Sequence, residues 1–185
     1  MKFRFLLPAA AVAVLCGALW YGLSAIRGGR YDPQLIESPL IGRAAPDFVT
    51  ENLLEPAQPI SRAQFVGKPF LLNVWGTWCP GCREEHESLL AIAKETDIPI
   101  IGISWKDDRQ LARDWLAQLG NPYRVVGVDP DGKIAIDWGV YGAPESFLVG
   151  ANGRILHKRI GPMTLDLWRN DFVPLLATGS GSGRQ

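Results

Sequence analysis

The sequence has no excess of charge of either sign, few cysteines and few histidines. Its 19 Lys and Arg residues balance 19 Asp and Glu residues, so the formal net charge is +0. Without a long-range positive field the chain has no electrostatic attraction to nucleic acid, and we do not expect a nucleic-acid partner. Three cysteines are too few for a domain held together by disulfides. No internal repeat is present, which excludes solenoid and propeller architectures.

The composition is that of a folded globular protein with about one domain. Hydrophobic residues make up 47% of the 185 residues, aromatic residues 10% and charged residues 21%. These values exclude a disordered or collagen-like chain, because enough apolar side chains are present to build a core.

The amino-terminal segment carries no charge from Phe5 to Ile26, and basic residues flank it on both sides. At about 1.5 Å per helical residue, this run is long enough to cross a hydrocarbon core of about 30 Å. A cleaved secretory signal is the alternative, but the run is long for a signal and offers only a weak cleavage site at Ser24-Ala25. We therefore expect an uncleaved single-pass transmembrane helix.

The anchor prediction also sets the expected boundaries and compartment. We expect an anchor over residues 1–27, a tether over 28–39, a folded domain over 40–176 and a flexible tail over 177–185. The basic flanks nearly balance, and we choose the orientation with the amino terminus inside the cell. The domain then lies outside the cytoplasm, where cysteines meet an oxidising environment.

Strand-like and helix-like segments alternate along the domain. Apolar runs of strand length and amphipathic stretches of helical spacing predict an α/β fold with a parallel core. Asn152-Gly153 is a strong hairpin signal, so the sheet is expected to be mixed and to end in an antiparallel pair. The expected strands are 70–75, 98–103, 123–128, 146–149 and 154–160. One expected helix begins at Pro80, and two further helices are expected over 107–119 and 164–176.

Two cysteines, Cys79 and Cys82, lie at the predicted junction of the buried strand and the next helix. The helix start favours a thiolate at Cys79, whereas Cys82 lies one turn further on and is expected to be more shielded. An attacking thiol and a resolving thiol are the requirements of thiol-disulfide exchange. Covalent haem attachment is excluded because Arg83, and not His, follows Cys82. A zinc site would need further ligands, of which His86, expected at the surface, and His157 are the usual kind.

Several motifs in fixed order give the sequence a specific resemblance. A proline, Pro144, precedes the predicted antiparallel strand, as in the thioredoxin superfamily, where this proline is cis and faces the C-x-x-C. More narrowly, the chain resembles the CcmG/DsbE family of membrane-anchored thiol:disulfide interchange proteins over nearly its whole length. The matching segments are Ile41-Gly-Arg-Ala-Ala-Pro-Asp-Phe48, Leu72-Asn-Val-Trp-Gly-Thr-Trp-Cys-Pro-Gly-Cys82, Lys106-Asp-Asp-Arg109, Leu119-Gly-Asn-Pro-Tyr123 and Gly139-Val-Tyr-Gly-Ala-Pro-Glu145.

The resemblance implies a thioredoxin-like fold, with an inserted strand and helix around residues 98–130, and a reductive role in bacterial cytochrome c maturation. Cys79 and Cys82 would cycle between dithiol and disulfide, without a further cofactor or metal, and reduce the cysteines of apocytochrome c or of a thiol carrier. A transmembrane thiol electron donor would reduce the pair again. The anchor would lie in the bacterial inner membrane and the catalytic domain in the periplasm.

The resemblance also suggests residues for proton transfer. Thioredoxin has a buried Asp six residues before its first cysteine, but here that position is Asn73, which does not titrate. The family pattern offers Glu85 and Glu145 as alternative acids. Carboxylates near Cys79 would disfavour its thiolate and make the disulfide harder to reduce, which predicts a reductant.

Three residues are expected to bind a peptide substrate. Pro144 offers backbone beside the cysteines, while Trp78 and Tyr141 are placed to form an aromatic wall. Trp75 is expected in the core instead, because it continues the buried strand. Three alternatives to the cytochrome role stay open: a general periplasmic reductant, a peroxidase, and a copper or metal chaperone that uses both thiols and His157.

Overall fold

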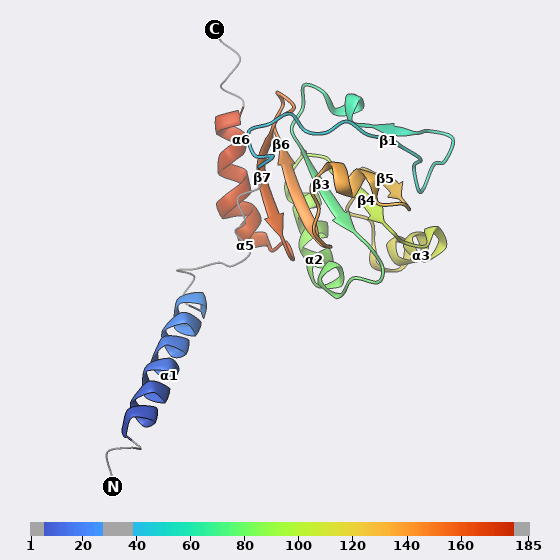
Figure 1. Cartoon of the computed structure of the whole chain (residues 1–185). Helices are drawn as coiled ribbons and strands as arrows, with labels where there is room; N and C mark the ends of the chain where they lie inside the picture. Colours follow the sequence, from blue (N-terminus) through green and yellow to red (C-terminus); the bar gives the residue numbers. More distant parts are fainter. Residues whose placement is uncertain (1–5, 28–38, 180–185) are drawn as a thin grey trace. The chain divides into compact units, whose positions relative to one another are not determined.

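The computed structural model describes residues 6–27 and 39–179 of the chain (Figure 1). Residue contacts divide the chain into two units, Met1–Ile36 and Glu37–Gln185. The first unit contains helix α1 (Leu6–Arg27), which carries the free cysteine Cys16. None of the helices within the described residues combines the length and hydropathy needed to cross a membrane, and the transmembrane helix stays a prediction from the sequence. Most of the predicted tether and tail lies outside the described residues.

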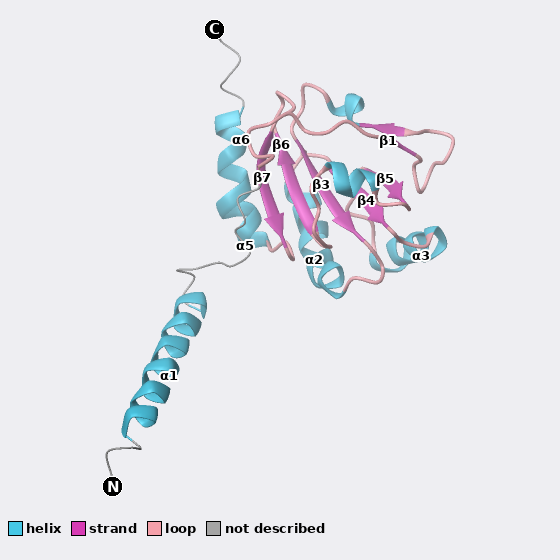
Figure 2. Ribbon diagram, in the orientation of Figure 1, coloured by secondary structure: helices cyan, strands magenta, loops and turns pink. Residues whose placement is uncertain are grey.

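A five-stranded mixed sheet forms the centre of the second unit, with strand order β5-β4-β3-β6-β7 (Figure 2). β3 is parallel to β4, and β4 is parallel to β5, whereas β6 pairs antiparallel with both β3 and β7. This confirms the predicted mixed thioredoxin-like sheet. The strands are β3 (Phe70–Trp75), β4 (Ile100–Trp105), β5 (Val125–Asp129), β6 (Glu145–Val149) and β7 (Ile155–Ile160).

Alternate side chains of β3 enter two separate cores, one on each face of the sheet. Leu71 and Trp75 pack with helices α2 (Pro80–Glu95) and α3 (Arg109–Leu119) and with the carboxyl-terminal helices. Phe70, Leu72 and Val74 pack on the other face, with the chain around residues 45–60 and with Trp138. Every residue of β3 is buried, which explains why its sequence is an almost continuous apolar run. The bounds of the strand are as predicted.

The carboxyl-terminal helical segment begins as predicted but is not a uniform helix. Thr164 caps it by accepting a hydrogen bond from the Leu167 amide on its hydroxyl at 3.2 Å. A π-helical turn then interrupts the expected helix, and Trp168 and Phe172 within it are both buried. The three pieces are α5 (Leu165–Leu167), η3 (Trp168–Phe172) and α6 (Val173–Gly179).

Four short elements were not predicted, because two to five residues give too little periodicity to detect. The helix α4 (Lys133–Asp137) follows the segment Asp129-Pro-Asp-Gly132, and the Asp129 carboxylate accepts hydrogen bonds from the amides of Ile134 and Ala135. The unpredicted elements are β1 (Val49–Thr50), β2 (Ile60–Ser61), the 3-10 helix η2 (Arg62–Phe65) and α4 (Lys133–Asp137).

Candidate active site

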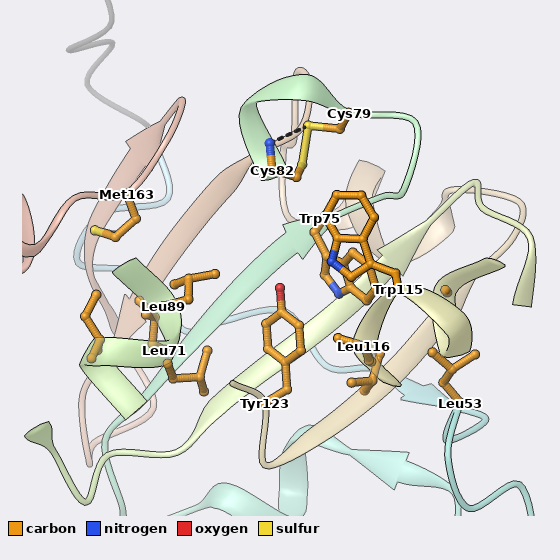
Figure 3. Close-up of a cluster of buried hydrophobic side chains, with 14 of the residues drawn as sticks. Leu53, Leu71, Trp75, Cys79, Cys82, Leu89, Trp115, Leu116, Tyr123 and Met163 are labelled. Carbon is orange, nitrogen blue, oxygen red and sulfur yellow. Dashed lines mark hydrogen bonds between the residues drawn. A yellow bond between two sulfur atoms is a disulfide. The ribbon is translucent and has the colours of Figure 1, made fainter. Parts of the chain in front are cut away.

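The two cysteines form a disulfide where β3 gives way to α2. Cys79 is the N-cap of α2, and its Sγ accepts a hydrogen bond from the Cys82 amide at 3.1 Å (Figure 3). Pro80 occupies the first helical turn, where the lack of an amide hydrogen costs nothing. Cys79 is 2% exposed and Cys82 is 3% exposed. The predicted difference in shielding is therefore absent in the disulfide form.

The loop before Cys79 is fastened to the loop after β4. The Asp107 carboxylate accepts hydrogen bonds from the Thr77 amide at 2.6 Å and from the Thr77 hydroxyl at 2.7 Å. The Trp78 indole donates to the Trp105 carbonyl at 3.2 Å, and the two indole rings meet edge to face. Trp78 stays 51% exposed beside the disulfide. Contacts with Trp105 thus hold one edge of the Trp78 ring, while much of the rest of the ring faces solvent.

Pro144 lies against the same helix turn. The Ala143–Pro144 peptide bond is cis, as the resemblance predicted. A Cβ placed on Gly81 would lie 2.9 Å from the Pro144 Cδ, so the proline ring packs directly on the backbone between the cysteines. Tyr141, three residues earlier, is 66% exposed. Trp78 and Tyr141 are therefore exposed, whereas Pro144 itself is buried against the helix turn.

Glu85 is buried on the cysteine face of the sheet. Its Oε1 accepts a hydrogen bond from the Asn73 amide group at 2.8 Å, and its Oε2 accepts one from the Met163 amide at 2.7 Å. The Tyr123 hydroxyl donates to Asn73 Oδ1 at 2.8 Å, which fixes the orientation of that amide. Burial raises the pKa of Glu85 from 4.5 to about 7, against the lowering effect of its two hydrogen bonds. A carboxyl with such a pKa can give or take a proton near neutral pH.

Glu145 lies on the opposite face of the sheet from Glu85. In β6, Ser146 pairs with Asn73 and bonds to it, so the neighbouring Glu145 side chain points to the other core. Its Oε2 lies 2.9 Å from the ammonium of Lys158, and both side chains are buried. The structure therefore places the Glu145 carboxylate in an ion pair with Lys158, on the face of the sheet away from Glu85.

Histidine positions differ from the sequence expectations in one case. His86 is buried, and not on the surface as predicted, because α3 covers it. Its Nε2 lies 3.0 Å from the Gly120 carbonyl oxygen, and its Nδ1 accepts a long hydrogen bond from the Trp115 indole at 3.4 Å. Burial is the largest cause of its lowered pKa. His157 packs edge-on against the Phe172 ring.

No group of three or more His, Cys, Asp and Glu residues in the part of the chain that is described could hold a metal ion.

Three residues of the site were not found from the sequence: Asp107, Tyr123 and Lys158. Each is far along the chain from the group that it contacts, so no local spacing connects them. Asp107 and Tyr123 do fall within segments that match the family, which marks the segments but assigns no contact. The sequence gives only a weak signal for Lys158: the residue is a lysine at a buried position of β7, a strand in which apolar and polar residues are mixed.

Comparison with known proteins agrees with this geometry. The family model described as Redoxin matches residues 40–172. The "Thiol:disulfide interchange protein DsbE" of Allochromatium vinosum is 43% identical over 178 residues, which cover 96% of this chain and 95% of the relative. The DsbE of Escherichia coli K12 is 42% identical over 177 residues, with 95% of each chain covered.

A solved structure supports the same fold. The secreted thiol-disulfide isomerase of Corynebacterium glutamicum superposes with a TM-score of 0.65 at 25% identity, covering 72% of this chain and 85% of that chain. These relatives are named as thiol:disulfide interchange proteins, and this chain has a disulfide between Cys79 and Cys82 at the start of α2. The chain is therefore a thiol-disulfide oxidoreductase and belongs to the Redoxin family, among the DsbE thiol:disulfide interchange proteins.

Proposed function

We propose that the chain is a periplasmic reductant for cytochrome c maturation, acting on the cysteines of apocytochrome c or of a thiol carrier. The observation that carries the proposal is the position of Cys79 as N-cap of α2, with the exposed ring of Trp78 next to it in the chain and the exposed ring of Tyr141 in the loop that leads to Pro144. An extended peptide can lie across this surface, with its backbone beside Pro144 and its apolar side chains on the two rings.

The reduction proceeds in two exchanges. The Cys79 thiolate, stabilised by the amino end of α2, attacks one sulfur of the substrate disulfide and forms a mixed disulfide. The Cys82 thiolate then attacks Cys79 Sγ, so the substrate leaves as a dithiol and the Cys79–Cys82 disulfide forms in the protein. Two electrons pass from protein to substrate, and a transmembrane thiol electron donor restores the protein dithiol.

Glu85 is the proposed proton acceptor for Cys82. The two residues are three positions apart on α2, so they share a face of the helix, and both belong to the buried interior. With a pKa of about 7, the carboxyl is partly ionised at neutral pH and can take the Cys82 proton when the mixed disulfide is resolved.

A peptide disulfide tests the function. A synthetic peptide with an oxidised Cys-x-x-Cys-His segment is mixed with the reduced full chain in detergent, and its dithiol is quantified. We expect wild type to reduce it, Cys79→Ser to be inactive, and Cys82→Ser to accumulate a one-to-one mixed disulfide. Cys16→Ser is the matched control, because Cys16 lies on α1 and should not affect the rate. Failure of wild type to reduce the peptide would refute the function.

A second peptide separates a dedicated reductant from a general one. The comparison peptide has the same length and disulfide but lacks the haem-ligating histidine and the flanking apolar residues. A dedicated reductant should reduce the cytochrome-like peptide faster. Equal rates would favour the general periplasmic reductant instead.

The proposal also includes single-pass anchoring in the bacterial inner membrane. It is supported by the uncharged run from Phe5 to Ile26 and its basic flanks. Alkaline carbonate extraction of membranes, together with mass spectrometry of the mature amino terminus, tests it. Retention of an intact chain in the membrane pellet is expected, whereas a soluble chain that begins after residue 25 would show a cleaved signal.

A further inference from the structure

A buried ion pair lies beneath the loop that leads to Pro144. The Lys158 ammonium is 2.9 Å from Glu145 Oε2, and the two side chains are 1% and 0% exposed. Burying both charges removes their hydration, and a buried pair of this kind gives little net stability compared with apolar side chains. Lys158 comes from β7, opposite Phe147 in the strand register. The pair therefore calls for a role other than general stabilisation of the sheet.

Each charge of the pair also holds the backbone of the loop. Glu145 Oε1 accepts hydrogen bonds from the amides of Tyr141 at 2.7 Å and Gly142 at 3.2 Å. The Lys158 ammonium donates to the Gly139 carbonyl at 2.7 Å. Hydrogen bonds to charged groups are stronger than those between neutral groups. Both sides of the loop are thus tied to one buried anchoring point.

Lys158 also contacts the exposed ring of Tyr141. Its ammonium lies 4.4 Å from the centroid of that ring and 5.2 Å from the centroid of Phe147. A cation over an aromatic face is attractive, more so when the cation is shielded from water. Tyr141 thereby keeps its inner face on Lys158 while two-thirds of the residue remains exposed. The loop continues from Tyr141 into Pro144, which packs on Gly81 of the C-x-x-C.

We propose that Lys158 is a positioning residue for peptide recognition: with Glu145 as its counter-ion, it holds Tyr141 and the Gly139–Pro144 loop in a binding-ready geometry beside the disulfide. The inference rests on the proposed function, since it deepens how the same site takes a peptide. It assigns Glu145 to the loop and leaves proton transfer to Glu85 on the other face of the sheet.

The test uses a double variant that leaves no uncompensated charge. Lys158→Met with Glu145→Gln replaces the ion pair by a thioether and an amide, and the amide oxygen can still accept from the Tyr141 and Gly142 amides. Lys94→Met is the matched control, because Lys94 is an exposed lysine in the last turn of α2. All are made in the full chain in detergent.

Two readouts separate positioning from a merely structural role. Steady-state reduction of the oxidised Cys-x-x-Cys-His peptide gives KM and kcat, and amide hydrogen exchange reports the loop directly. For the double variant we expect KM to rise about fivefold with kcat within about twofold of wild type. The Tyr141 and Gly142 amides should exchange faster, while β4 amides keep their protection. Lys94→Met should behave as wild type.

The outcomes distinguish this inference from the proposed function. A double variant with unchanged KM, or with unchanged exchange at Tyr141 and Gly142, overturns the role of Lys158. Equal loss of protection in β4 would show a general structural effect and would also overturn it. A wild-type protein that reduces no peptide refutes the proposed function instead, and the exchange measurement still decides whether Lys158 holds the loop.

Discussion

Replacement of Glu85 by glutamine changes how stability depends on pH, and the size of this change follows from the burial of the carboxyl. Burial raises the pKa of Glu85 from 4.5 to about 7 in the folded protein. The folded state therefore keeps a proton that the unfolded chain has lost between these two values, and stability falls as pH rises through this window. The loss amounts to about 1.4 kcal/mol per pH unit, or about 3 kcal/mol in total.

Denaturant unfolding of the oxidised protein measures this effect. The free energy of unfolding is determined for wild type and Glu85→Gln at about pH 4, 6 and 8. Glutamine does not titrate, so the stability of the variant relative to wild type should rise by about 3 kcal/mol between the lowest and the highest pH. Any constant offset reflects hydrogen bonds that an amide makes differently. Glu87→Gln, an exposed position on the same helix, is the control.

A difference between Glu85→Gln and wild type that does not vary with pH would refute the reasoning. It would mean that the carboxyl titrates at its ordinary value despite its burial. The hydrogen bonds from Asn73 and Met163 would then offset desolvation fully, and Glu85 would be a carboxylate at neutral pH.

Three further changes test other contacts. Asp107→Ala should lower the free energy of unfolding by about 1–3 kcal/mol, because it removes both hydrogen bonds to Thr77, and an unchanged denaturation midpoint would contradict this. Tyr123→Phe should cost about 1–3 kcal/mol, since Asn73 Oδ1 loses its donor inside the core; thermal unfolding measures it, and a neutral result would argue against the network. Burial lowers the pKa of His86, so its contribution to stability is present above about pH 6.5 and is lost as the pH falls. His86→Gln should reduce that acid-side loss, and an identical pH profile would show that the ring has the same pKa in the folded and the unfolded state.

The sequence predicted the elements whose residues carry a local signal. The strand at 70–75 was predicted to the residue because both of its faces are buried, and the hairpin before β7 was predicted because Asn152-Gly153 favours a tight turn with positive φ, seen at Gly153. The π-helical turn at 168–172 was missed, since the pattern of apolar residues there also fits an ordinary helix. The two-residue strands β1 and β2 are too short to show alternation.

The site was predicted where chemistry lies within one motif and missed where it depends on distant partners. The motif around Cys79 and Cys82, together with the family resemblance, predicted the disulfide, and Trp75 is in the core as expected. The surroundings of Glu145 could not be predicted, because the ion pair with Lys158 depends on the register of β6 against β7. Burial of His86 likewise depends on how α3 packs over α2, which the helical pattern alone leaves open.

The most direct test of the central claim is the equilibrium reduction potential of the Cys79–Cys82 pair. The full chain in detergent is titrated against a dithiol buffer, and the fluorescence of Trp75 and Trp78, which lie close in sequence to the disulfide, reports its state. A reductant of periplasmic disulfides should have a potential of roughly −200 mV or lower. A value near roughly −120 mV would make the protein an oxidant, and would contradict the account.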